Sequence, residues 1–201
     1  MAMCMNNFVL VVLVMVLIGC GTTAKEIQMK SQGEKAGVFV EVKDGEPIPQ
    51  GFVNLTIKAT VKTHLEGYYV FESKKSPHGK STYLFLVNID GQSSTWQVKG
   101  VKETVPLYDK DGKTNRDPDA GEGIKYVLEK RLRLNAGTHK IFIGLPADDY
   151  FKKIEISLTE GDVYTLEFRP VYKYKTRPTR IPRFEQGIKE FEVFLNGVRV
   201  P

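Results

Sequence analysis

The chain has 201 residues, a formal net charge of +5 and 41% hydrophobic residues. This length is enough for one substantial hydrophobic core or for two small ones. Both of its cysteines, Cys4 and Cys20, lie near the N-terminus. From residue 21 onward the sequence therefore excludes a cysteine nucleophile, a cysteine-ligated zinc site and a disulfide framework.

The first predicted element is an uninterrupted apolar segment from Phe8 to Ile18. It is shorter than the roughly 20 apolar residues that a membrane-spanning helix needs. Its position and length are typical of the hydrophobic part of a secretory signal peptide, although no Lys or Arg precedes it. We expect residues 1–19 to be a signal peptide.

The end of this segment, Leu17-Ile18-Gly19-Cys20, resembles the lipobox of bacterial lipoproteins. The resemblance implies cleavage before Cys20 and a diacylglyceryl group on its sulfur, with further acylation of the new amino group. Two or three acyl chains make a stable membrane anchor, whereas one does not. Gly21 rather than Asp follows the cysteine, which by the sorting rule of enteric-type lipoproteins implies the outer membrane. We therefore expect a lipid-anchored protein of the bacterial cell envelope.

Residues 20–36 are polar and show no clear hydrophobic period. The sequence predicts that they form a tether between the lipidated cysteine and a folded domain. At roughly 3.3 Å per residue, such a tether could hold the domain up to about 50 Å from the membrane. An ordered first strand or helix is the alternative.

The remainder of the chain, residues 37–201, has mostly β patterns. In residues 52–64, Val53, Leu55, Ile57, Ala59 and Val61 alternate with polar residues, which predicts a half-buried strand. Other strands are expected at 37–43, 67–73, 81–89, 124–134, 139–145, 152–159, 162–168 and 189–200.

Turn sequences separate these strands, among them Asp90-Gly91, Glu160-Gly161 and Asn196-Gly197, which favour hairpins. No helix is predicted before residue 184. Short strands at this spacing predict an all-β fold, a β-sandwich of immunoglobulin-like or PEGA-like type. One domain over 37–201 is expected, or two sub-sandwiches divided near 108–123.

Residues 132–168 resemble PEGA-type modules, which are small β-sandwich repeats of bacterial envelope proteins. The segment Leu134–Ile141, then Pro146 and Tyr150, then the ISLTEGDVYTLEF sequence carry this resemblance, while the P-E-G-A tetrapeptide is absent. The resemblance implies a fold class and no activity.

The loop 108–123 is rich in side-chain oxygens at alternating positions, which are the ligands that Ca²⁺ prefers. The candidate ligands are Asp109, Asp111, Asn115, Asp117 and Asp119. The spacing does not fit an EF-hand, and Lys110, Lys113 and Arg116 are interleaved. A hydrophilic hairpin loop is the alternative to a structural Ca²⁺ site, and no other cofactor is expected.

Positive charge is concentrated between Phe168 and Lys189, a segment with seven positively charged residues and one negatively charged residue. We call this segment the basic arm, and its candidate contact residues are Arg169, Lys173, Lys175, Arg177, Arg180 and Arg183. In an envelope protein, lipid headgroups, acidic glycans or an acidic protein face are natural partners, and nucleic acid is not. A solvated connecting arm without a ligand is the alternative.

Sequence motifs for catalysis are weak. His78-Gly79-Lys80-Ser81-Thr82 lacks the first glycine of a phosphate-binding loop, and no G-x-S-x-G is present. His64, His78 and His139 are far apart in sequence. The sequence thus predicts a non-enzymatic accessory or binding module that holds a protein, glycan or lipid partner near the membrane. The alternatives are an envelope hydrolase whose site assembles in space, and a Ca²⁺-stabilised structural spacer.

Overall fold

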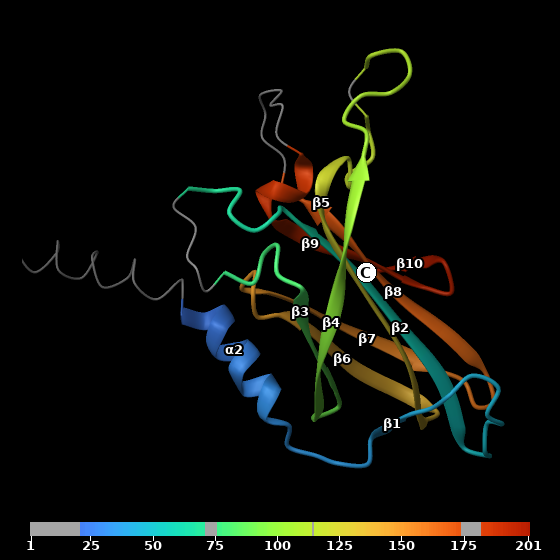
Figure 1. Ribbon diagram of the computed structural model, residues 1–201. Coiled ribbons are helices and arrows are strands. Elements are labelled where there is room, and N and C mark those ends of the chain that lie inside the picture. Colours follow the sequence, from blue (N-terminus) through green and yellow to red (C-terminus); the bar gives the residue numbers. More distant parts are fainter. Residues whose placement is uncertain (1–20, 71–75, 114, 174–181) are drawn as a thin grey trace, which may run out of the picture.

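The computed structural model describes residues 21–70, 76–113, 115–173 and 182–201. In these ranges the chain is all-β apart from one α-helix and one short 3-10 helix (Figure 1). The elements are α2 (Gly21–Gln32), β1 (Phe39–Glu41), β2 (Phe52–Thr63), β3 (Thr82–Ile89), β4 (Gln92–Val105), β5 (Gly121–Asn135), β6 (Gly137–Leu145), β7 (Tyr150–Leu158), β8 (Val163–Tyr172), η1 (Arg183–Gln186), β9 (Ile188–Leu195) and β10 (Val198–Val200). The all-β prediction is confirmed, but residues 67–70 of the predicted strand 67–73 are not strand.

The described strands form one curled, mixed sheet in the order β10-β9-β8-β2-β5-β4-β3-β6-β7, with β1 paired to β5. β2 and β8 are parallel, and the other pairs are antiparallel. The curl brings β7 close to β9, where the Phe191 N–H donates to the Tyr150 hydroxyl over 2.8 Å. Because one continuous sheet encloses the core, the finer prediction of an immunoglobulin-like or PEGA-like sandwich is not confirmed.

Strand β4 joins the two halves of this sheet. Its first part, residues 92–99, pairs with β3, and its last part, residues 100–105, pairs with β5. Gly100 lies where the partner changes, and a Cβ there would be 2.3 Å from Ile124 and 2.6 Å from the Tyr126 ring. A side chain at this corner would force the strands apart, so glycine permits the change of partner.

The core is continuous across the sheet. Val53, Leu55 and Ile57 of the central strand β2 have no exposed surface, as their alternation predicts. β2 lies between β5 and β8, which both follow the 108–123 loop in sequence. Residues on both sides of that loop therefore share one core, and the division into two sub-sandwiches is not observed in the described residues.

Residues 21–32 form the helix α2 rather than an extended tether, and Figure 1 shows it beside β3 and β6. Ile27 is buried against Leu86 and Phe142, which point away from the main core. The Asn88 side chain donates to the Lys30 carbonyl over 2.9 Å, which satisfies one of the acceptors that a helix end leaves open. The tether prediction is wrong for these residues because one apolar side chain docks an otherwise polar helix.

Candidate functional site

A cavity of about 270 Å³ lies at one end of the curled sheet. The end of β2, the segment 76–80, the β6–β7 turn, η1 and the start of β9 meet there. The polar residues that line it include Lys62, Thr63, His64, His78, Asp148 and Glu185. We refer to this space as the mouth cavity.

Asp148, in the turn between β6 and β7, is the best-anchored acid of the mouth cavity. One carboxylate oxygen lies 3.0 Å from Nε2 of His78, and the other accepts a hydrogen bond from the Tyr83 hydroxyl. The Asp148 side chain is only 9% exposed. Burial, followed by the negative charge of Asp148, raises the pKa of Tyr83, so that phenol remains a proton donor.

The position of His78 depends on its neighbour Gly79. The Gly79 N–H donates to the Thr63 hydroxyl over 3.0 Å, and its φ angle of +71° favours glycine. A Cβ at Gly79 would lie 2.1 Å from the backbone nitrogen of Glu66. The segment carrying His78 is therefore pressed against the chain that leaves β2, which aims the imidazole at Asp148.

His64 lies directly after β2 and is buried. Its Nδ1 donates to the Leu65 carbonyl over 2.9 Å. The His64 ring centroid is 5.2 Å from that of His78 and 5.0 Å from that of Tyr69. His64 and His78 are fourteen positions apart in the sequence, and the structure brings their rings together. The sequence alone carries no signal for this contact.

The third histidine lies outside the mouth cavity. His139 of β6 is buried, with Nδ1 2.7 Å from Asp90 and Nε2 2.9 Å from the Asn135 carbonyl. Asp90 in the β3–β4 turn covers this ring. His139 has a structural role in this arrangement.

Glu185, in the short helix η1, is the second acid of the mouth cavity. Burial raises its pKa, and a hydrogen bond from the Tyr68 side chain lowers it by less. Its Oε2 atom is buried without a hydrogen-bond partner among the described residues. Buried polar atoms without partners are rare in folded proteins and require an explanation.

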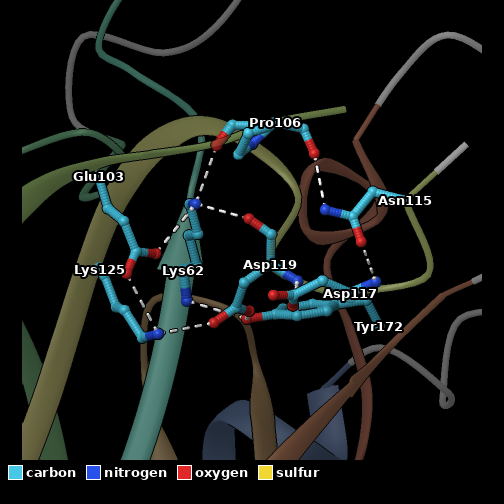
Figure 2. A network of polar contacts seen from close by, with 9 residues as sticks. Lys62, Glu103, Pro106, Asn115, Asp117, Asp119, Lys125 and Tyr172 are labelled. Carbon is cyan, nitrogen blue, oxygen red and sulfur yellow. Dashed lines mark hydrogen bonds and ion pairs between the residues drawn. The ribbon is translucent and has the colours of Figure 1, made fainter. Parts of the chain in front are cut away.

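Lys62 closes the inner wall of the mouth cavity, and Figure 2 shows its contacts. Its ammonium group donates to Oε2 of Glu103 over 3.1 Å, to the Asp119 carbonyl over 2.6 Å and to the Gly121 carbonyl over 2.9 Å. An ammonium has three N–H donors, so these contacts use all of them. Lys125 completes the network through Glu103 and the Asp119 carboxylate.

The predicted Ca²⁺ loop is held by hydrogen bonds between its own residues. Oδ1 of Asp109 accepts from the backbone N–H groups of Asp111 and Lys113, and Oδ1 of Asn115 accepts from that of Asp117. Oδ1 of Asp117 accepts from the Asp119 N–H, while the Asp119 carboxylate pairs with Lys125. The structure therefore does not bring the five predicted ligands together, and Figure 2 shows Asp119 facing lysines.

Within residues 21–70, 76–113, 115–173 and 182–201, no three His, Cys, Asp or Glu side chains are grouped so as to hold a metal ion.

The basic arm is described only in part. Arg169 on β8 pairs with Glu167 over 2.6 Å and lies 4.1 Å from the centroid of the Phe194 ring. Lys173 follows β8, and Arg183 begins η1. Lys175, Arg177 and Arg180 lie outside the described residues. Pro170 is accommodated in β8 because the pairing with β2 ends at Phe168, so no β2 carbonyl requires its missing N–H.

Cys20 and the lipobox-like residues before it also lie outside the described residues. In the part of the chain that the structure describes, no helix has the length and apolar character that crossing a membrane requires.

Comparison of the whole chain with protein-family models, with curated proteins and with solved structures gives no match.

Proposed function

We propose that this chain is a lipid-anchored binding module of the bacterial envelope, without catalytic activity, that takes a small ligand into the mouth cavity. The observation that carries the proposal is the cavity itself, with polar groups from five separate segments of the chain converging on it. Small-molecule sites are typically concave, contain a few convergent polar groups and often lie in the mouths of β-barrels. The cavity at the end of the curled sheet has both features.

The anchor in this proposal is the lipid on Cys20. Cys20 comes directly before Gly21, the first residue of α2, and α2 is docked on the sheet through Ile27. The link from lipid to sheet would then be a docked helix rather than a tether, and the domain would lie close to the bilayer. Confinement to a surface raises the effective concentration of a module toward its membrane partners.

The basic arm is the proposed second contact of the module. Its surplus of cations supports an anionic partner at the membrane surface, such as lipid headgroups or an acidic protein face. Arg169 is already paired with Glu167 and Arg183 contacts the Arg116 carbonyl, so the proposal does not depend on these two residues.

An envelope hydrolase is the second candidate, and the His78–Asp148 contact favours it. An imidazole oriented by a carboxylate can act as a general base. Two of the neighbouring side chains are unsuited as nucleophiles, since the Thr63 hydroxyl donates to the His64 carbonyl and Lys62 has used its three protons. Binding without turnover therefore agrees better with the contacts described.

The test is to purify the lipidated protein from membranes and identify what it retains by native mass spectrometry. A retained small molecule or partner, released by His78→Gln together with Glu185→Gln, supports the binding module. Incubation with envelope extract tests the second candidate, because product formation that His78→Gln abolishes would establish a hydrolase. Cys20→Ser should move the protein out of the membrane fraction, and membrane retention of this variant would refute the anchor.

A further inference from the structure

We propose that the mouth cavity recognises its ligand through a protonated amine, so that the ligand class is small primary ammonium compounds. This inference rests on the proposed binding function and specifies the ligand chemistry of the same site. Its starting point is an imbalance between donors and acceptors in the cavity wall.

Three basic residues of the cavity wall, Lys62, His64 and His78, direct their donors to protein acceptors. Lys62 donates its three protons to Glu103 and two carbonyls, and its charge is offset by Glu103. His64 donates to the Leu65 carbonyl, and Nε2 of His78 faces Asp148. These groups leave no proton for an anionic ligand, although a lysine lines the cavity.

The acceptors of the cavity wall are in surplus. Asp148 accepts one bond at each oxygen and has lone pairs for more. Glu185 contributes Oε2, which is buried and has no partner among the described residues. An ammonium group supplies three donors and a positive charge, and it would satisfy the buried carboxylate oxygen.

The aromatic residues of the cavity wall suit the same ligand class. Tyr69 and Phe184 both line the mouth cavity, and ring faces attract cations within about 6 Å of the centroid. Phe184 already has the Lys62 ammonium 5.0 Å from its centroid. Aromatic rings next to carboxylates are a usual setting for binding ammonium groups.

The size of the mouth cavity restricts the ligand further. Its volume of about 270 Å³ lies just below the range of roughly 300–1,000 Å³ that is usual for ligand pockets. A compound of the size of a monosaccharide or smaller is expected, rather than a peptide or an acyl chain.

The experiment uses three pairs of probes in which an ammonium group is exchanged for a hydroxyl group: butylamine with butanol, ethanolamine with ethylene glycol, and glucosamine with glucose. Titration calorimetry with the lipidated protein in detergent measures each affinity at neutral pH. We expect at least one amine to bind, and its hydroxyl counterpart to bind about tenfold more weakly or worse, because a charge-assisted hydrogen bond is lost.

Two variants assign the binding to the mouth cavity. Glu185→Gln keeps the shape of the side chain and should weaken the amine by about tenfold or more. Glu155→Gln, on the exposed face of β7, should leave the affinity of the protein for the amine unchanged. Equal binding of an amine and its hydroxyl counterpart, or unchanged amine affinity in Glu185→Gln, would overturn the ammonium inference and leave the binding function standing.

Failure of every probe to bind would also overturn the ammonium inference. The binding function is decided independently, by whether native mass spectrometry finds a ligand that the wild-type protein retains and the cavity variant releases.

Discussion

The ammonium group of Lys62 lies 3.1 Å from the Glu103 carboxylate, and this ion pair connects β2 to β4 across the intervening strand β5. The Lys62 side chain has no exposed surface, while that of Glu103 is one-third exposed. On the same strand, Lys58 pairs with Glu129 at 3.0 Å, with both side chains well exposed. The two pairs have similar distances and very different surroundings.

This difference predicts unequal costs for the same substitution. Lys62→Met should lower the free energy of unfolding by about 3 kcal/mol, because it leaves the Asp119 and Gly121 carbonyls without their donor and leaves Glu103 with Lys125 alone. Lys58→Met should cost less than about 0.5 kcal/mol, since exposed ion pairs contribute little. Urea unfolding of both variants measures this, and equal losses would contradict the described network.

Gly79→Ala should both destabilise the protein and displace His78. The added methyl group meets backbone atoms of Leu65 and Glu66, which cannot rotate away. Gly161→Ala is the matched control, because Gly161 also has a positive φ angle but open space around its Cβ position. Gly161→Ala should lower the free energy of unfolding by about 1 kcal/mol, because alanine is strained in a left-handed backbone conformation. Gly79→Ala should lower it by about 2 kcal/mol more, because the added methyl group is also overpacked.

Unfolding experiments give the two stabilities, and the imidazole resonances of His78 report its position. A Gly79→Ala variant as stable as Gly161→Ala, with unchanged His78 resonances, would show that this glycine does not position the histidine.

Much of the sheet could be predicted from local patterns. The alternation in β2 identified Val53, Leu55 and Ile57 as inward-facing, and Asn196-Gly197 identified the β9–β10 hairpin. Asp90-Gly91 likewise indicated the β3–β4 hairpin, but residues 99–105 of β4 have little apolar alternation and gave no strand signal. The parallel pairing of β2 with β8 has no local signal, since it joins segments that are far apart in sequence.

The candidate site was less predictable than the sheet. His64, His78, Asp148 and Glu185 lie on four separate connecting segments, and only the curl of the sheet brings them together. Helix α2 was missed for a related reason. Its single buried apolar residue, Ile27, gives no helical period, and the Leu86–Phe142 surface on which it docks exists only after folding.

The docking of α2 predicts a local effect of one substitution. Ile27→Ala should cost about 2–3 kcal/mol and increase hydrogen exchange throughout residues 21–32, because it removes the apolar contact with the sheet. Met29→Ala is the control on the same helix, since Met29 is 53% exposed. Equal exchange in the two variants would mean that Ile27 does not hold the helix.

Removal of Ca²⁺ should leave the melting temperature unchanged. The oxygens of Asp109, Asn115 and Asp117 already accept backbone N–H groups within their own loop, so six to eight oxygen ligands are not available together. Thermal unfolding in millimolar Ca²⁺ and in chelator measures this. A clear rise of the melting temperature with Ca²⁺, lost in Asp109→Asn with Asp117→Asn, would restore the Ca²⁺-stabilised spacer.

Glu185→Gln should stabilise the protein at neutral pH, even though it is expected to weaken ligand binding. Burial raises the pKa of Glu185 above its ordinary value of 4.5, so the folded state binds this proton more tightly than the unfolded state does. The stability from this group is therefore complete below pH 4.5 and is lost as the pH rises through the folded-state pKa.

Glutamine cannot ionise, so Glu185→Gln should exceed the wild type in unfolding free energy at neutral pH, and the difference should vanish in acid. The gain should be below about 1 kcal/mol, because the carboxyl is partly screened by solvent. Urea unfolding from acid to neutral pH measures it, with Glu155→Gln as the exposed control. A Glu185→Gln variant that is less stable than the wild type at neutral pH would mean that the protein itself satisfies this carboxylate, and a ligand ammonium would then have no unpaired oxygen to bind.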